Sequence, residues 1–100
     1  MPIVTEANAA ENAVAVMVEG RFDSTCHGDF RRAFLSCDAT TRFTIDLQKA
    51  SFMDSAALGL LLLLREKVGG DASRVEIINA HGQPREVLNV ANFGQLFRVT

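Results

Sequence analysis

Short apolar segments with a period of two residues alternate along this 100-residue chain with segments whose period is three to four residues. The first period is typical of a half-buried strand and the second of an amphipathic helix. Strands are expected at 3–5, 13–19, 42–47, 74–79 and 96–99, and helices at about 24–37, 54–68 and 84–92. Gly20 is expected to end the second strand, and 48–53 to form a loop. The order ββαβαβαβ predicts an α/β fold with helices packed against a mixed sheet, and we treat 1–100 as a single domain.

The composition excludes several classes of function. The net charge is −2, and the pair Arg31-Arg32 is the nearest approach to a basic cluster, so nucleic-acid binding is not expected. The N-terminus has neither the basic region nor the long apolar run of a signal peptide. The most apolar run, Ala56 to Leu64, is about half as long as a membrane span. We therefore expect a cytoplasmic protein that does not bind membranes.

Two cysteines, Cys26 and Cys37, fall eleven residues apart in the first expected helix. Eleven steps return almost to the same helix face, but at a separation of about 16 Å along the axis. A disulfide requires Cα atoms within about 7 Å, so the two cannot pair inside a helix. We expect small, buried, reduced side chains, which agrees with a cytoplasmic location.

The segment Ser51 to Gly70, SFMDSAALGLLLLLREKVGG, carries the most functional information. Asp54 is a good helix N-cap, which places Ser55 in the first turn. Backbone N–H groups there lack intrahelical partners and the helix dipole favours an anion, including a phosphate carried on Ser55 itself. Asp and Ser most often do no more than cap a helix, however, so these features alone leave both roles open.

The expected helix at 54–68 is apolar on more than one side. At 100° per residue its core face takes Ala57, Leu60, Leu61, Leu64 and Val68. The opposite face takes Ser55, Gly59, Leu62 and Glu66, with Leu58 and Leu63 on the flanks. A solvent-facing side is normally polar. Either another element or a second copy in a homodimer covers this side, or it is a docking surface beside the serine.

The segment Phe52 to Gly59, followed by an apolar helix, closely resembles the signature of the STAS domains, in particular the bacterial anti-sigma factor antagonists. The segments Ile45 to Leu47, Gly20 to Asp23 and Asn92 to Phe97 are similar to further motifs of that family. The resemblance covers nearly the whole chain. Two departures are the pair Ala56-Ala57, which offers no second hydroxyl, and the end of the sequence directly after the last expected strand.

The resemblance implies a partner switch, and neither an enzyme nor a cofactor-binding protein. The unphosphorylated antagonist would bind an anti-sigma factor that is also a serine kinase, and so free a sigma factor. The kinase would phosphorylate Ser55, and a PP2C-type phosphatase would reset the cycle. Asp54 and Gly59 belong to the motif. The candidate partner-binding residues are Asp23, Met53, Leu58, Leu62 and Leu63.

Other chemistries find little support in the sequence. The only histidines are His27 and His81, and no Gly-x-Ser-x-Gly elbow surrounds Ser55. These histidines and the two cysteines lack the spacing of a metal site, and no glycine-rich loop is present to hold a nucleotide. The remaining alternative is a STAS adaptor that is not phosphorylated and acts in a larger signalling or transport complex. The pair Asp54-Ser55 favours the switch.

Overall fold

The computed structural model describes residues 3–35, 37–38, 40–70 and 74–100. Its strands are β1 (Ile3–Asn8), β2 (Ala13–Val18), β3 (Gly20–Phe22), β4 (Arg42–Asp46), β5 (Ala50–Met53), β6 (Arg74–Ile78) and β7 (Arg98–Val99). Its α-helices are α1 (His27–Phe34), α2 (Ser55–Lys67) and α3 (Gly82–Val90). The expected α/β class is confirmed, and each expected helix is present with shifted ends.

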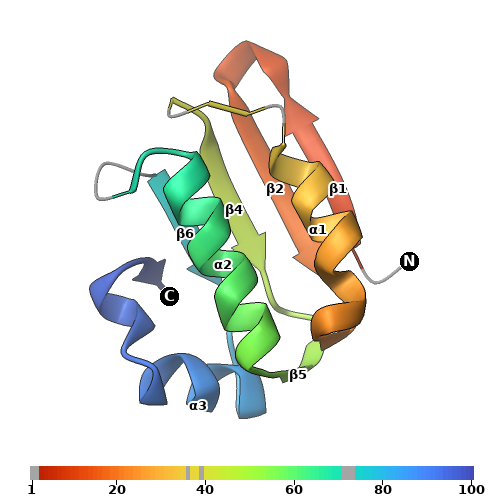
Figure 1. Cartoon of the computed structure of the whole chain (residues 1–100), viewed down its shortest axis with the longest axis vertical. Helices are drawn as coiled ribbons and strands as arrows, with labels where there is room; N and C mark the ends of the chain where they lie inside the picture. Colours follow the sequence, from red (N-terminus) through yellow and green to blue (C-terminus); the bar gives the residue numbers. More distant parts are fainter. Residues whose placement is uncertain (1–2, 36, 39, 71–73) are drawn as a thin grey trace.

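Five strands form a mixed sheet in the order β1-β2-β4-β6-β7. β1 is antiparallel to β2, whereas β2, β4, β6 and β7 run parallel to one another. Helices α1 and α2 lie side by side over one face of this sheet, and α3 lies beyond its lower end, near β5 (Figure 1). This arrangement places the beginning of α2 between β5 and α3.

Alternating residues of the parallel strands fill the core beneath the two helices. Val14, Val16 and Val18 of β2 are buried, as are Phe43 and Ile45 of β4. The core face of α2 is buried along its whole length, as the helical spacing predicts. The period-two and period-3.6 patterns therefore identify the correct inward faces of both kinds of element.

A second sheet of two parallel strands, β3 and β5, was not expected from the sequence. Gly20 does not end strand structure. Its left-handed backbone, with φ of 76°, bends the chain, and β3 starts there. The Gly20 N–H donates to the Lys49 carbonyl oxygen at 2.8 Å, which begins the pairing with β5. Each strand has only three or four residues, so neither shows a readable alternation.

Three further expectations need correction. The first helix is shorter than expected: Cys26 lies in a 3₁₀ turn (Ser24–Cys26) before α1, and Cys37 lies beyond its end. Both cysteines are free thiols, but only Cys26 is fully buried. The last strand is reduced to β7 because a 3₁₀ turn, Phe93–Gln95, follows the left-handed Asn92.

Candidate functional site

The beginning of α2 is organised by Asp54. Its backbone is extended, and its carboxylate Oδ1 accepts the Ala57 N–H at 3.1 Å. Its carbonyl oxygen accepts the Leu58 N–H at 3.2 Å, which closes the first helical turn. Ser55 is therefore the first helical residue, and its side chain is exposed. The serine hydroxyl stands in solvent at a helix N-terminus, where the macrodipole favours negative charge.

Gln83, in the first turn of α3, fixes the residue that precedes this cap. Its Oε1 accepts the Met53 N–H at 2.8 Å, and its Nε2 donates to the Met53 carbonyl oxygen at 2.9 Å. The side-chain amide thus satisfies both backbone groups of Met53 and ties α3 to the end of β5. No local pattern indicates this role, because the two residues are 30 positions apart in the sequence.

A largely apolar groove of about 440 Å³ lies between α2 and α3. We call it the α2–α3 groove, and its lining residues are Met53, Asp54, Ser55, Leu58, Gln83, Glu86, Val87, Val90 and Ala91. Val90 is 86% exposed, and Leu58 and Val87 are half-buried. Val87 and Val90 were not among the site residues predicted from the sequence. The apolar Val90 on the exposed side of α3 was the available signal.

The outer face of α2 continues the apolar surface away from the groove. This face consists of Ser55, Gly59, Leu62 and Glu66, all exposed. Leu62 is 39% exposed and the flanking Leu63 49%. Among the described residues, no element covers these two side chains enough to bury them. Open space surrounds Gly59 where a Cβ would stand. Apolar surface therefore borders the serine both along α2 and across to α3.

Asp23 lies at the same end of the molecule as Asp54. Phe22 and Met53 are direct partners in the parallel pair of β3 and β5. Asp23 and Asp54 directly follow these two residues, and they therefore lie at the same edge of that sheet. Asp23 caps its own 3₁₀ turn by accepting the Thr25 N–H at 3.0 Å. Both aspartates thus begin helical segments at one edge, beside Ser55.

The carboxylate of Asp23 is held in its charged form by its neighbours. The Thr25 hydroxyl, the Thr25 N–H and Arg21 donate hydrogen bonds that lower the pKa of Asp23 below 3.8. Arg21 Nε lies 3.2 Å from Asp23 Oδ2, and its guanidinium stacks 4.0 Å above the Phe52 ring. The Asp23 carboxylate therefore stays ionised at this edge, with Arg21 as its paired cation.

The structure separates the predicted partner-binding residues into two groups. Asp23, Leu58, Leu62 and Leu63 reach the surface at or beside α2. Met53 does not: its side chain is 1% exposed and belongs to the core. The expected loop at 48–53 is wrong, because Ala50–Met53 forms strand β5. Met53 lines the α2–α3 groove although its side chain is almost fully buried, and its role in partner binding stays a prediction.

The histidines are not placed to activate Ser55. His81 Nε2 lies 2.8 Å from the Gln48 carbonyl oxygen, and His27 is exposed at the start of α1. Within the described ranges, no side chain forms a hydrogen bond with the Ser55 hydroxyl. The same residues contain no group of three or more His, Cys, Asp and Glu side chains that could hold a metal ion. Among the described residues, the helices lack the length and hydrophobicity of a membrane-spanning segment.

Comparison with known proteins agrees with this architecture. A STAS-domain containing protein of Pseudomonas aeruginosa (strain UCBPP-PA14) is 37% identical over 101 residues, covering the whole of both chains. The fold is similar to that of the anti-sigma factor antagonist SpoIIAA in its unphosphorylated form, with a TM-score of 0.73 and 21% identity over 98% of this chain and 86% of that one. An anti-sigma factor antagonist from Mycobacterium paratuberculosis gives a TM-score of 0.78 at 19% identity, over 97% of this chain and 82% of that one. Residues 5–98 match the family described as "Mlab, STAS domain", and the chain therefore belongs to the STAS domain family.

Proposed function

We propose that this protein is a phosphorylation-controlled binding module acting in the cytoplasm as one domain over residues 1–100. Unphosphorylated, it binds an anti-sigma factor that is also a serine kinase, and a sigma factor is thereby freed. Phosphorylation of Ser55 ends the complex, and a PP2C-type phosphatase restores it. The observation that carries this proposal is an exposed serine at the N-terminus of α2, bordered by the apolar α2–α3 groove.

Solved structures of similar fold support control by phosphorylation. The structures similar to this one include SpoIIAA, an anti-sigma factor antagonist, in both its unphosphorylated and phosphorylated forms. Ser55 begins a helix, and the N-terminus of a helix favours an anion. We therefore expect phosphorylation to leave the fold almost unchanged. The switch would act at the partner surface.

Charge and apolar burial together explain why a phosphate would end binding. A phosphoserine carries about −1.5 to −2 charge at neutral pH. It would stand beside Asp54 and Glu86, which line the same groove, and at the edge that carries Asp23. A partner that covers Leu58 and Val90 would have to desolvate this dianion, which is costly without a paired cation.

The direct test is the intact mass of the protein purified from its own host, with and without phosphatase treatment. We expect a species heavier by one phosphate that phosphatase removes, and peptide mapping that places the group on Ser55. Ser55→Ala should abolish the heavier species, whereas the matched variant Ser51→Ala, at an exposed residue of β5, should retain it. A phosphate on Ser24 or Ser51 would contradict the assignment. Complete absence of phosphate in host cells would favour the adaptor alternative.

A further inference from the structure

The five-stranded sheet has a second face, which the described helices leave uncovered. α1 and α2 both lie over the opposite face (Figure 1). On the uncovered face, side chains alternate with the buried ones: Ala15 of β2 is exposed, and Thr44 of β4 and Glu76 of β6 are half-buried neighbours in register. This face includes a hollow of about 540 Å³, the size of many ligand and peptide sites.

Three arginines converge on this hollow. Its lining includes Arg42, Arg74 and Arg98, three of the chain's ten lysine and arginine residues, although the whole chain has a net charge of −2. Arg42 and Arg74 are direct partners in the parallel pair of β4 and β6. Their Cα atoms are therefore about 4.8 Å apart, a placement at which like charges repel.

The acidic side chains of the hollow do not neutralise this pair. Glu76 is engaged by Arg98, whose Nε lies 3.7 Å from its Oε2. The remaining acid of the lining is Glu11. Within the described part of the chain, neither Arg42 nor Arg74 forms an ion pair or a side-chain hydrogen bond. The guanidinium groups of two residues paired on neighbouring strands are left to bind an external anion.

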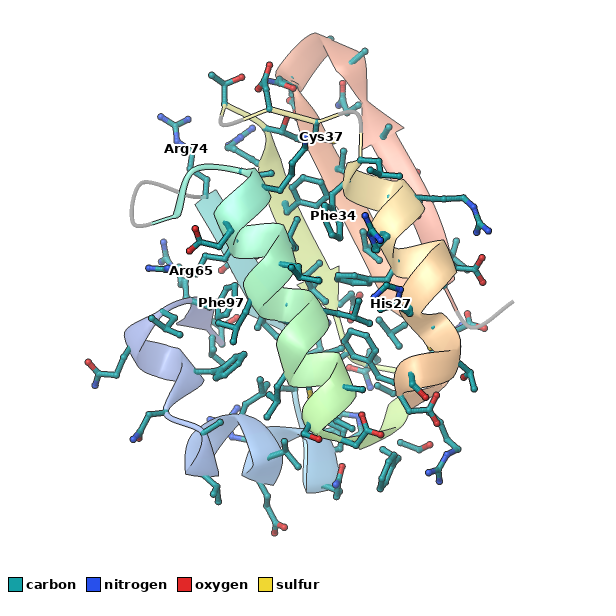
Figure 2. All side chains as sticks on the ribbon, in the orientation of Figure 1. His27, Phe34, Cys37, Arg65, Arg74 and Phe97 are labelled. Atoms are coloured by element: carbon teal, nitrogen blue, oxygen red, sulfur yellow. The ribbon has the colours of Figure 1, made fainter. Side chains whose placement is uncertain are left out.

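The arginines lie far from the site on α2. Arg42 and Arg74 are the first residues of β4 and β6, whereas Ser55 follows the carboxyl end of β5. Figure 2 shows Arg74 near the end of α2, at the opposite end of that helix from its start. A ligand on the arginine face would therefore leave the α2–α3 groove accessible.

The shape of the surface favours an extended ligand over a compact one. A single exposed ion pair contributes at most about 1 kcal/mol, so a small anion on an open sheet would bind weakly. Arg98 is offset from Arg74 by two residues along the strand, because it pairs with Glu76. Carboxylates on alternate residues of an extended segment are spaced by about 6.6 Å, which matches that offset.

From this geometry we infer that the uncovered sheet face binds an acidic, extended segment of a partner protein, through Arg42, Arg74 and Arg98. Apolar parts of the segment would lie over Ala13 and Leu96, which line the same hollow. This second interface is distinct from the α2 surface and does not depend on Ser55. It would allow the protein to hold one partner while its contact with another is switched.

The test is fluorescence anisotropy with a labelled hexaglutamate peptide, using the full chain at low and moderate salt. We expect measurable binding at low ionic strength that weakens as salt screens exposed charges. The double variant Arg42→Glu/Arg74→Glu should bind about tenfold more weakly. Arg31→Glu/Arg32→Glu, an exposed pair on α1 with the same change in net charge, should bind as the wild type does. Thermal unfolding of all variants verifies that they fold.

Three outcomes would overturn the inference. The first is no binding of the peptide by the wild type, and the second is an equal loss in both double variants, which would indicate attraction by net charge alone. The third is binding of a single-stranded oligothymidylate at least as tightly as the peptide. If that binding depended equally on Arg42 and Arg74, the surface would be a polyphosphate site. The variant Ser55→Asp should retain peptide binding, since the two surfaces are separate.

Discussion

The two faces of α2 consist of the same amino acid in different surroundings. Leu60 to Leu64 is an unbroken run of leucine, yet Leu60, Leu61 and Leu64 are at most 1% exposed while Leu62 and Leu63 are 39% and 49% exposed. Hydrophobicity cannot distinguish the two sets, but their positions around the helix do. The buried set holds the helix on the sheet. We expect the exposed set to contribute far less to the free energy of unfolding, and it lies on the same side as Ser55.

The largest expected effect separates these faces directly. Leu61→Ala should lower the free energy of unfolding by about 2–5 kcal/mol, because it leaves a cavity in a packed core. Leu62→Ala should lower it by about 0.5 kcal/mol or less, as exposed substitutions usually do. Urea unfolding curves of both variants measure the difference.

Titration with the partner protein completes the comparison of Leu61→Ala with Leu62→Ala. Leu62→Ala should weaken binding of the unphosphorylated protein to its partner by more than about 1 kcal/mol if it lies at the interface centre. Ser55→Asp serves as the variant that does not bind. An early melt of Leu62→Ala would show that the exposed face is structural, and normal binding by a stable Leu62→Ala would place the interface elsewhere.

The contrast between the buried and exposed leucines of α2 also shows which features of the fold could be predicted from the sequence. The faces of α2 were predictable because helical periodicity is local, and because Asp54 and Gly69 mark the ends of the pattern. The pairing of β3 with β5 was not, because both strands are very short and Gly20 pairs with Ala50, far along the sequence. Their pairing depends on contacts between distant parts of the chain, and a single sequence does not record such contacts.

The residues of the candidate site also divide into those that local sequence could predict and those that it could not. Ser55 and Asp54 could be placed from their own neighbours in sequence, and both lie at the helix start as expected. Gln83 could not, because its role exists only once α3 packs beside β5, and for Val90 the one signal was an apolar residue on the exposed side of its helix. The burial of Met53 could not be predicted either, because it depends on strand β5, which its own segment does not reveal.

The second prediction concerns the link that holds the exposed side of α2 in place. Gln83→Ala removes two hydrogen bonds to the Met53 backbone and leaves a largely buried N–H without its partner. We expect a loss of about 1–3 kcal/mol in the free energy of unfolding. Gln95→Ala, at an exposed glutamine of the last 3₁₀ turn, should cost about 0.5 kcal/mol or less. Equal losses in the two variants would refute the positioning role of Gln83.

The third prediction compares two adjacent residues at the helix start. Asp54→Ala should cost about 1 kcal/mol, because the Ala57 N–H loses its capping acceptor. Ser55→Ala should change stability by no more than about 0.5 kcal/mol, since its side chain is exposed and caps nothing. Chemical denaturation of both measures this step. A Ser55→Ala loss as large as that of Asp54→Ala would indicate that the serine is structural.

The smallest expected effect is a pH dependence at Asp23, on the exposed edge beside α2. The Thr25 hydroxyl and N–H, together with Arg21, lower the pKa of Asp23 in the folded protein below the ordinary value of 3.8. A group whose pKa is lowered by folding stabilises the folded state above its unfolded pKa, and this contribution disappears as the pH falls through the folded pKa. Asp23→Asn keeps a capping side chain but removes the charge. The free energy of unfolding of Asp23→Asn should therefore be below that of the wild type near neutral pH, and the difference between the two should vanish as the pH falls below 3.8.

Carboxyl NMR titration gives the pKa of Asp23 in the folded protein directly. Thr25→Val should raise this pKa toward 3.8, because it removes the largest cause of the shift. A wild-type midpoint at or above 3.8 would show that the cap does not hold a charged carboxylate at this edge.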